Sequence, residues 1–336
     1  MKRVAAVLTA LVLVAAVASV VFARGAAERE FVRIATAGTG GNMYRIGAGM
    51  ASIWNDEIEG VTFSTQSTGG SPHNAELMAT GQVEVAFIGA EIAEQAFLGF
   101  GRFEGEDPEK YSNINYLVYV YPNFHAMIVH PNAADEIQSE YDLEGKVVSK
   151  GLLGSQGEAW WFHMVETLGL NLDTIVMEDT VHGEAIDQMR DGIIDATYWQ
   201  DGYGSPSHFE MLEMGAQLRS LHPDAIEAFT TGNFHMNEPY TLPAGTYPNQ
   251  PEAVTGVISP IIMIVRSDVD EDLVYQMTKA LYENQRALAS IAGLLADFMT
   301  LDDAGIGKVV PVHPGAARYY EEHGVTLERL VHPAFR

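Results

Sequence analysis

The stretch RIATAGTGGNMYRIGAGM, from Arg33 to Met50, passes from an apolar run through a glycine-rich turn into a helical pattern. The run over residues 31–36 has the apolar and β-branched content of a strand. After the glycines, Met43, Ile46 and Met50 recur at spacings of three and four residues, which places them on one face of a helix. The stretch therefore predicts a β-strand, a tight turn and an amphipathic helix in direct succession.

The same succession recurs along the chain. Further strands are predicted at Val61–Gln66, Val83–Ile88 and Val147–Ser149, and helical patterns follow them. The segment Met189–Trp199 repeats the residue types of Met78–Ile88, in which a helix end leads into a buried strand. Strands that alternate with helices are typical of a mainly parallel sheet covered by helices. The fold class is therefore α/β, and the repeat predicts two similar lobes rather than one continuous sheet.

Two serines stand where helices are predicted to begin. Ser71 is expected to be an N-cap, with Pro72 at the first helical position. Ser155 and Glu158 have the spacing of a capping box. In the sequence LGSQG, Leu153 replaces the first glycine of the G-x-S-x-G motif of hydrolases. Ser155 is therefore interpreted as a helix cap rather than a nucleophile.

Residues 1–23 begin with Lys2 and Arg3, continue as an apolar run and end in the small-residue pattern VFA. This arrangement is typical of a secretory signal peptide. The apolar run is long, so an uncleaved N-terminal anchor in the cytoplasmic membrane is the alternative. The chain contains no cysteine, so neither a lipidated cysteine nor a disulfide can form. The mature protein is expected in the periplasm.

The composition argues against several classes of function. The formal net charge of −26 disfavours nucleic acid and anionic lipid as partners. The eleven histidines form no metal-binding motif, so no metal site is expected. The turn at residues 38–41 lacks the lysine of a phosphate-binding loop, and Met43 replaces the third glycine of a dinucleotide fingerprint. We therefore expect no cofactor and no enzymatic activity.

Three glycine-rich turns open predicted helices and are the candidates for ligand binding: residues 39–42, 68–74 and 154–157. The first N–H groups of a helix have no partner within the helix and carry the positive end of its dipole. Glycine lets a ligand approach the backbone closely, and neighbouring Ser and Thr hydroxyls add donors. Two or three converging turns of this kind predict a site for a small organic anion that needs no arginine.

Four blocks of the sequence resemble, in order, the TAXI family, the extracytoplasmic solute receptors of TRAP transporters. The blocks are TAGTGGNMYRIGAGMASIWN, TQSTGGSPHNAELMATGQVEVAFIGAEIAEQAFLG, LPAGTYPNQ and VPVHPGAARYYEEHGV. The resemblance implies a two-lobed periplasmic binding protein, type II-like, with hinge strands between the lobes. It further implies capture of glutamate, 2-oxoglutarate or a related carboxylate and its delivery to the membrane subunits of a TRAP transporter. A monomer is expected.

The resemblance and the turn chemistry together give a set of expected ligand-binding residues: Thr39, Gly40, Gly41, Asn42, Tyr44, Thr68, Gly69, Ser71, Asn74, Ser155, Gln156 and Trp199. Arg45 is expected to face solvent. The apolar runs Tyr116–Val129 and Val257–Val265 are long enough to cross between lobes. Lobe I is expected over residues 24–121 and 268–336, and lobe II over residues 122–267.

Two other classes of protein stay open at the level of sequence. A secreted hydrolase would use Ser155 as its nucleophile, with a histidine and a carboxylate within reach. A ligand sensor would have the same two lobes but would signal to a membrane kinase rather than to a permease.

Overall fold

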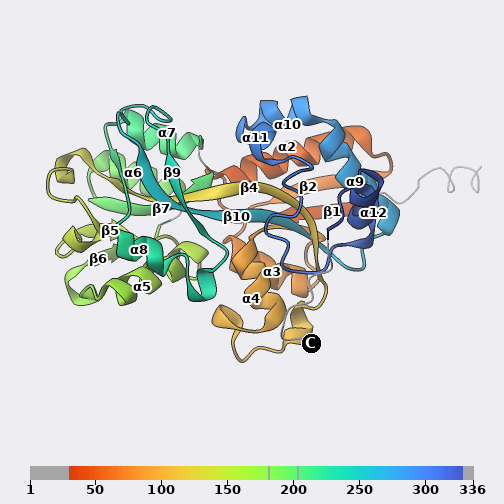
Figure 1. Cartoon of the computed structure of the whole chain (residues 1–336), viewed down its shortest axis with the longest axis horizontal. Helices are drawn as coiled ribbons and strands as arrows, with labels where there is room; N and C mark the ends of the chain where they lie inside the picture. The colour runs from red at the N-terminus through yellow and green to blue at the C-terminus, as the bar shows by residue number, and fades with distance from the viewer. Residues whose placement is uncertain (1–29, 181, 203, 328–336) are drawn as a thin grey trace, which may run out of the picture.

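The computed structural model describes residues 30–180, 182–202 and 204–327, and it shows two α/β lobes side by side (Figure 1). The proposed signal peptide, residues 1–23, lies outside the described residues. Within the described residues, no helix is both long and apolar enough to span a bilayer. The predicted α/β, two-lobed architecture is confirmed.

Lobe I begins with three strands that alternate with helices. The elements are β1 Glu30–Ala35, α2 Asn42–Glu57, β2 Val61–Gln66, α3 Ser71–Ala79, β3 Val85–Gly89 and α4 Ala90–Leu98. Strand β1 pairs in parallel with both β2 and β3. Met43, Ile46 and Met50 are buried on the inner face of α2, as their spacing predicts. The strand, turn and helix expected from the opening stretch are therefore confirmed.

Lobe II repeats this alternation with three strands of three residues each and two longer ones. Its elements are β5 Val147–Ser149, α5 Gln156–Leu168, β6 Val176–Glu178, α6 His182–Asp191, β7 Ala196–Gly202, α7 Pro206–Glu213, β8 Gln217–Arg219, α8 Pro223–Ala228 and β9 Glu238–Leu242. Strand β5 pairs in parallel with β6 and β7. Helices α5 and α8 contact each other, as do α6 and α7, and the two pairs belong to separate apolar clusters.

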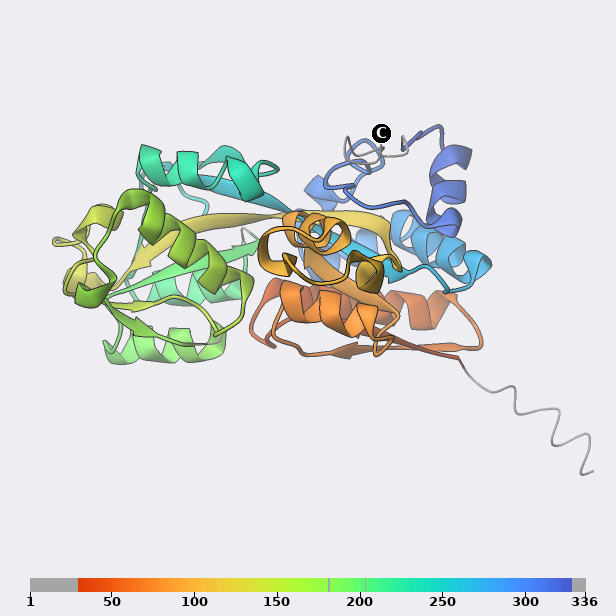
Figure 2. The ribbon, with the colours of Figure 1, turned by 90° about the horizontal axis from the view of Figure 1, so that it is seen from below.

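Two long antiparallel strands, β4 Ile114–Val129 and β10 Val254–Arg266, run through both lobes (Figure 2). The hydrogen-bonded order of the main path is β2-β1-β3-β10-β4-β7-β5-β6, with β8 on β4 and β9 on β10. The expectation of two separate sheets is therefore wrong. Because β4 and β10 pair with strands of both lobes, they join the two halves into one sheet.

Two prolines face each other where these strands cross between the lobes. Pro122 of β4 is the register partner of Pro260 of β10, and the register shifts just beyond, between Ile261 and Ile262. Proline has no N–H to donate, so neither residue can contribute a donor to the ladder. The connection between the lobes therefore lacks two backbone donors at this pair.

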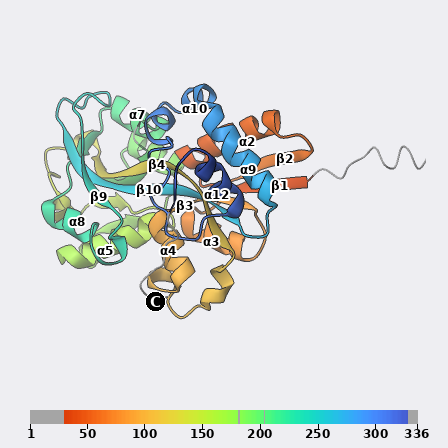
Figure 3. The same ribbon diagram turned by 45° about the vertical axis from the view of Figure 1, so that its right-hand side comes forward.

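The C-terminal part of the chain returns to lobe I. Its helices are α9 Glu271–Glu283, α10 Gln285–Ile291, α11 Leu294–Phe298 and α12 Pro314–Glu322. Helices α9 and α12 lie side by side at the outer end of lobe I, and α9 also contacts α2 (Figure 3). Short 3-10 segments occupy Gly101–Phe103, Pro108–Tyr111, Pro131–Ala133, Glu140–Asp142, Leu172–Thr174 and Gly232–Phe234.

The buried apolar side chains form three clusters that divide along the chain. The largest contains residues from 32 to 121 and from 261 to 320, and it is the core of lobe I. The other two contain residues from 124 to 257 and lie in lobe II. Both β4 and β10 thus contribute one end to each core, which anchors the crossing strands in both lobes.

The two serines predicted to cap helices differ in their roles. The N-cap of α3 is Gly70, at φ 92°, a left-handed conformation that favours glycine. Ser71 is the first helical residue, and its hydroxyl accepts from the N–H of Gly89 instead. Ser155 is the N-cap of α5, as predicted, and accepts from the Glu158 N–H at 3.2 Å. The Glu158 carboxylate accepts from Gly154 N–H, so it supports the turn before the cap.

Candidate ligand-binding site

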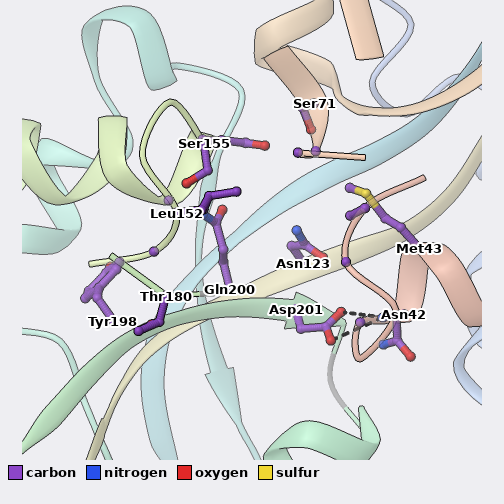
Figure 4. Close-up of a pocket in the computed structure, with 18 of the residues that line it drawn as sticks. Asn42, Met43, Ser71, Asn123, Leu152, Ser155, Thr180, Tyr198, Gln200 and Asp201 are labelled. Atoms are coloured by element: carbon purple, nitrogen blue, oxygen red, sulfur yellow. Dashed lines mark hydrogen bonds between the residues drawn. The ribbon is translucent and has the colours of Figure 1, made fainter. Parts of the chain in front are cut away.

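A cavity of about 120 Å³ lies between the lobes, where the carboxyl ends of the parallel strands meet helix N-termini (Figure 4). Residues of both lobes line it: Ala37, Gly38, Gly41, Asn42, Met43, Thr68, Gly69, Gly70, Ser71, Tyr121, Asn123, Ser149, Gly151, Leu152, Ser155, Gln156, Gly157, Thr180, Thr197, Tyr198, Gln200 and Asp201. The position follows the general rule that open α/β sheets bind ligands beyond the carboxyl ends of their strands.

The N-terminus of α2 is occupied by a carboxylate of the protein itself. The peptide N–H of Asn42 donates to the two oxygens of Asp201, at 3.4 and 3.3 Å, and the Asn42 side chain donates to Gly202 O at 3.2 Å. Asp201 lies at the end of β7 in lobe II, so these bonds join the lobes. The first of the three anion-binding turns is therefore filled from across the cleft, while Thr39 and Gly40 are exposed and do not line the cavity.

The Asp201 carboxyl group is 3% exposed. Its burial raises the pKa to about 6, although hydrogen bonds from the N–H groups of Gly202 and Asn42 and the charge of Arg45 act in the opposite direction. Arg45 is half-buried rather than solvent-facing, and its guanidinium donates to the Asn42 side-chain oxygen at 2.7 Å. Arg45 thus lies behind Asn42 and does not line the cavity.

The N-termini of α3 and α5 approach the cavity from opposite lobes. In Figure 4, Ser71 and Ser155 lie on either side of its upper part. Within the described residues, the peptide N–H groups of Ser71, Gln156 and Gly157 have no hydrogen-bond partner. Unpaired N–H groups at the start of a helix attract negative charge. Two of the three predicted turns therefore present free donors to the cleft.

Thr68 and Asn74, both expected to bind ligand, form a hydrogen-bonded support beneath the α3 turn. The Asn74 amide donates to Thr36 O at 2.6 Å and to Phe87 O at 2.7 Å. Its oxygen lies 2.6 Å from the Thr68 hydroxyl, which also accepts from Gly70 N–H. Asn74 is fully buried and does not line the cavity, so it holds the turn in place, whereas Thr68 reaches the cavity wall.

Four polar side-chain atoms on the cavity wall are buried and have no partner in the described part of the chain: Tyr121 Oη, Asn123 Oδ1, Tyr198 Oη and Gln200 Oε1. Buried polar groups in folded proteins are almost always hydrogen-bonded, to protein, water or ligand. Desolvation raises the pKa of the Tyr121 phenol well above its usual value, and it does the same for Tyr198. Both phenols are therefore neutral O–H groups available to a ligand.

A second contact between the lobes lies beside the α5 N-terminus. The side-chain amide of Gln156, in lobe II, donates to the carboxyl group of Glu91, in the first turn of α4 in lobe I. Glu91 is fully buried, and this burial raises its pKa to about 7. Farther along the same edge, His235 lies 3.5 Å from Glu94. The cavity thus lies between two inter-lobe contacts, at Asp201 and at Glu91.

The described cavity wall carries one carboxyl group and no basic side chain. Among the residues that line it within the described chain, Asp201 is the only one of the Asp, Glu, Lys, Arg and His types. No group of three or more potential metal ligands occurs among the described residues. A solute in this cavity is therefore contacted by helix N-termini, hydroxyls, amides and one carboxyl group.

Comparison with known proteins agrees with this geometry. Residues 34–324 match the model of the NMT1-like family. The chain belongs to the NMT1-like family. Among solved structures, the periplasmic binding protein BugD superposes with a TM-score of 0.54 at 13% identity, over 88% of this chain and 98% of BugD. A structure described as a periplasmic transporter gives 0.50 at 13% identity, over 90% and 99% of the two chains.

The alkanesulfonate-binding protein SsuA from Xanthomonas axonopodis pv. citri, solved with bound MOPS, is more distant. Its TM-score is 0.45 at 14% identity, over 89% of this chain and 92% of that one. This NMT1-like protein is similar in structure to BugD and to the periplasmic transporter. It therefore has the fold of a two-lobed periplasmic binding protein.

Of the residues expected from sequence, this NMT1-like protein brings seven to the cavity: Gly41, Asn42, Thr68, Gly69, Ser71, Ser155 and Gln156. Tyr44 is half-buried and does not line it. Trp199 lies in β7 opposite Ala126, and its side chain is outside the described part of the structure. The hydroxyl of Ser155 accepts from its own helix, as a cap does.

The expected set left out several lining residues of the NMT1-like fold: Met43, Tyr121, Asn123, Leu152 and Thr180, together with Tyr198, Gln200 and Asp201, which lie beside the expected Trp199 on β7. A signal was present for Asn123, which is a polar residue after Pro122 within an otherwise apolar run. Tyr198 and Asp201 lie at the end of a buried strand, which in α/β folds is a usual position for ligand contacts.

Proposed function

We propose that this protein is a periplasmic solute receptor that closes its two lobes around a small carboxylate and delivers it to the membrane subunits of a TRAP transporter. The main support is the cavity between the two lobes. The N-termini of two helices from opposite lobes contribute unpartnered N–H groups to it, at Ser71, Gln156 and Gly157. A solute carboxylate placed there would accept hydrogen bonds from both lobes at once and would hold them together.

The strength of such a site comes from several small terms. Each helix N-terminus stabilises a nearby anion by roughly 0.3 to 1 kcal/mol, and more where water is excluded. Hydrogen bonds to a charged acceptor contribute about 1.5 to 3 kcal/mol each. The Tyr121 and Tyr198 hydroxyls, buried without described partners, are available as further donors. The site needs no arginine or lysine to hold a carboxylate of low molecular weight.

Opening and closing would occur at the crossing strands. Because the two cores divide between Tyr121 and Phe124 on β4, and between Ile258 and Ile261 on β10, we place the hinge at Pro122 and Pro260. The first position agrees with the boundary at residues 121–122. The second lies before the expected boundary at residues 267–268, since the end of β10 packs in the core of lobe I.

Delivery to a TRAP transporter rests on the sequence resemblance. The blocks STGGSPHN and HPGAARYYEE are the most specific parts of it. The first forms the turn at the α3 N-terminus, and the second forms α12. Glutamate and 2-oxoglutarate are the solutes that the resemblance suggests, and residues 1–23 would direct the protein to the periplasm.

The test is a thermal-shift screen on protein unfolded, freed of co-purified solute and refolded. Mono- and dicarboxylates, amino acids and sugars are compared, and at least one carboxylate should raise the midpoint, since a ligand at 100 times its Kd stabilises by about 2.7 kcal/mol. Gly157→Ala places a methyl 2.7 Å from Gln200 Nε2 in the cavity, so it should weaken the response. Gly183→Ala is the matched control, at the second position of α6 with open space around it. No response to any carboxylate would overturn the proposal.

A further inference from the structure

We infer that the solute is a small α-amino acid with an uncharged side chain, with its carboxylate at the N-termini of α3 and α5 and its ammonium group against Asp201. This inference rests on the proposed function and narrows it. It is drawn from the unequal chemistry of the two ends of the cavity.

The two ends of the cavity differ in the chemical groups that they present. Figure 4 shows Ser71 and Ser155 at one end, Asp201 with Asn42 at the other, and Asn123 between them. The first end carries unpartnered peptide N–H groups, which attract a carboxylate. The second end carries a carboxyl group, which attracts a cation or a donor. A solute that satisfies both ends has one negative and one positive group.

The carboxylate of Asp201 can accept more hydrogen bonds than its described donors supply at normal distances. A carboxylate has about four lone-pair sites. The described donors to Asp201 are the N–H of Gly202 at 2.8 Å, the Asn42 N–H shared between both oxygens, and the Ser207 hydroxyl at 3.4 Å. All but the first of these bonds exceed 3.2 Å, beyond the usual range for N–H···O and O–H···O bonds. An ammonium group, with three donors, would complete this set.

The described cavity wall has no basic side chain that could bind a second carboxylate. No lysine, arginine or histidine lines the cavity in the described part of the structure. Arg45, the cation beside Asp201, donates to the far side of Asn42. A dicarboxylate such as 2-oxoglutarate, with one carboxylate at the helix N-termini, would place the other against the carboxyl group of Asp201. Like charges brought together in a buried site disfavour binding.

The volume of the cavity limits the size of the solute. The cavity volume is about 120 Å³, and an engineered cavity of roughly 150 Å³ accommodates benzene. By the same comparison, the cavity fits a solute of about five or six non-hydrogen atoms. Glycine and alanine are within this range.

The experiment is calorimetric titration of refolded, solute-free protein with matched probes, after a thermal-shift screen of all uncharged α-amino acids. Each amino acid that responds is compared with its deaminated acid, for example alanine with propionate, and with its amide, which lacks the carboxylate. 2-Oxoglutarate and succinate serve as dicarboxylates. We expect the amino acid to bind at least about tenfold more tightly than either truncated probe, because each loses a charged hydrogen-bonding group.

The variant Asp201→Asn assigns the ammonium site. It should weaken binding of the amino acid by about tenfold or more while changing binding of the deaminated acid by less, so that the preference shrinks. Ser207→Ala removes a neighbour of Asp201 but keeps the carboxyl group, and it should retain the preference. Equal losses for both probes in Asp201→Asn would mean that Asp201 acts only in lobe closure, and the ammonium assignment would be wrong.

The remaining outcomes separate this inference from the proposed function. If no amino acid binds more tightly than 2-oxoglutarate, succinate and the deaminated acids, the inference is wrong. The proposed function as a receptor for carboxylates would still be supported. If no carboxylate binds, with or without an ammonium group, both fail.

Discussion

The carboxylate of Asp201, at the end of β7, accepts a hydrogen bond from the peptide N–H of Asn42, the first residue of α2, across the boundary between the lobes. The two residues are 159 positions apart in the chain. The contact places a carboxyl group of lobe II at a helix N-terminus of lobe I, where negative charge is stabilised. The contact between the lobes at Asp201 is therefore a carboxylate bound at a helix N-terminus. The other helix N-termini at the cavity can bind a carboxylate of the solute in the same way.

Lobe closure in the solute-free protein should depend on pH through Glu91 and Asp201. Burial raises the pKa of Glu91 to about 7 and of Asp201 to about 6 in the closed form, from ordinary values of 4.5 and 3.8. An opened cleft would expose both groups to water, so the closed form binds protons more tightly. Raising the pH from about 4 to 7 therefore favours opening, by up to about 3 kcal/mol for Glu91 alone.

Small-angle scattering measures this effect as a larger radius of gyration at pH 8 than at pH 5. Glu91→Gln keeps an amide partner for Gln156 but cannot ionise, so its change with pH should be smaller. The exposed Glu227→Gln is the control and should behave as the unmodified protein. Identical pH profiles for Glu91→Gln and the unmodified protein would refute a role for Glu91.

The proline pair in the crossing strands should be visible in hydrogen exchange. Pro122 and Pro260 are register partners without N–H groups, so the ladder is weak on both sides of them. The amides of Tyr121 and Asn123 should exchange faster than those of Met127 and Ile128 on the same buried strand, which have partners on β7 and β8. Uniform protection along β4 would contradict a hinge at this position.

The buried Asn74 should contribute to stability rather than to binding. Asn74→Ala removes donors to the carbonyls of Thr36 and Phe87 and leaves both buried. The free energy of unfolding should fall by about 2 to 4 kcal/mol in urea titrations. Asn132→Ala, at an exposed position, should change it by less than about 0.5 kcal/mol. An unaltered stability in Asn74→Ala would contradict the supporting role described for this amide.

Close packing of α12 on α9 should make Gly315 intolerant of a side chain. A Cβ there would contact the backbone oxygen of Glu271 and lie 2.7 Å from Tyr275 N. Gly315→Ala must therefore push the helices apart, and we expect a loss of at least about 2 kcal/mol in unfolding free energy. A melting temperature equal to that of Gly183→Ala would show that the helices adjust without cost.

Local patterns predicted much of the fold and seven of the residues that line the cleft, but not the rest of its wall. The helical spacing of Met43, Ile46 and Met50 and the cap at Ser155 depend on neighbours within a few residues, and both predictions are confirmed. The α3 cap was assigned one residue late, because Gly70 takes a left-handed conformation that a propensity for serine caps does not reveal.

The parts that could not be predicted depend on contacts between distant segments. The single sheet arises because β4 and β10 pair with both lobes, and no local pattern encodes which strands become neighbours. The occupation of the α2 N-terminus by Asp201 likewise requires the two lobes to be closed on each other. Thr39 and Gly40 are exposed instead of lining the cavity, as the sequence of the turn alone cannot reveal that Asp201 occupies the helix N-terminus.

The most direct test of the account is a crystal structure of the protein with the solute selected by the thermal-shift screen. We predict that the solute lies between the lobes, with a carboxylate oxygen within hydrogen-bond distance of the peptide nitrogens of Gln156 or Gly157 and of Ser71. A solute bound outside this cavity, or inside it with the carboxylate turned away from both helix N-termini, would contradict the central claim.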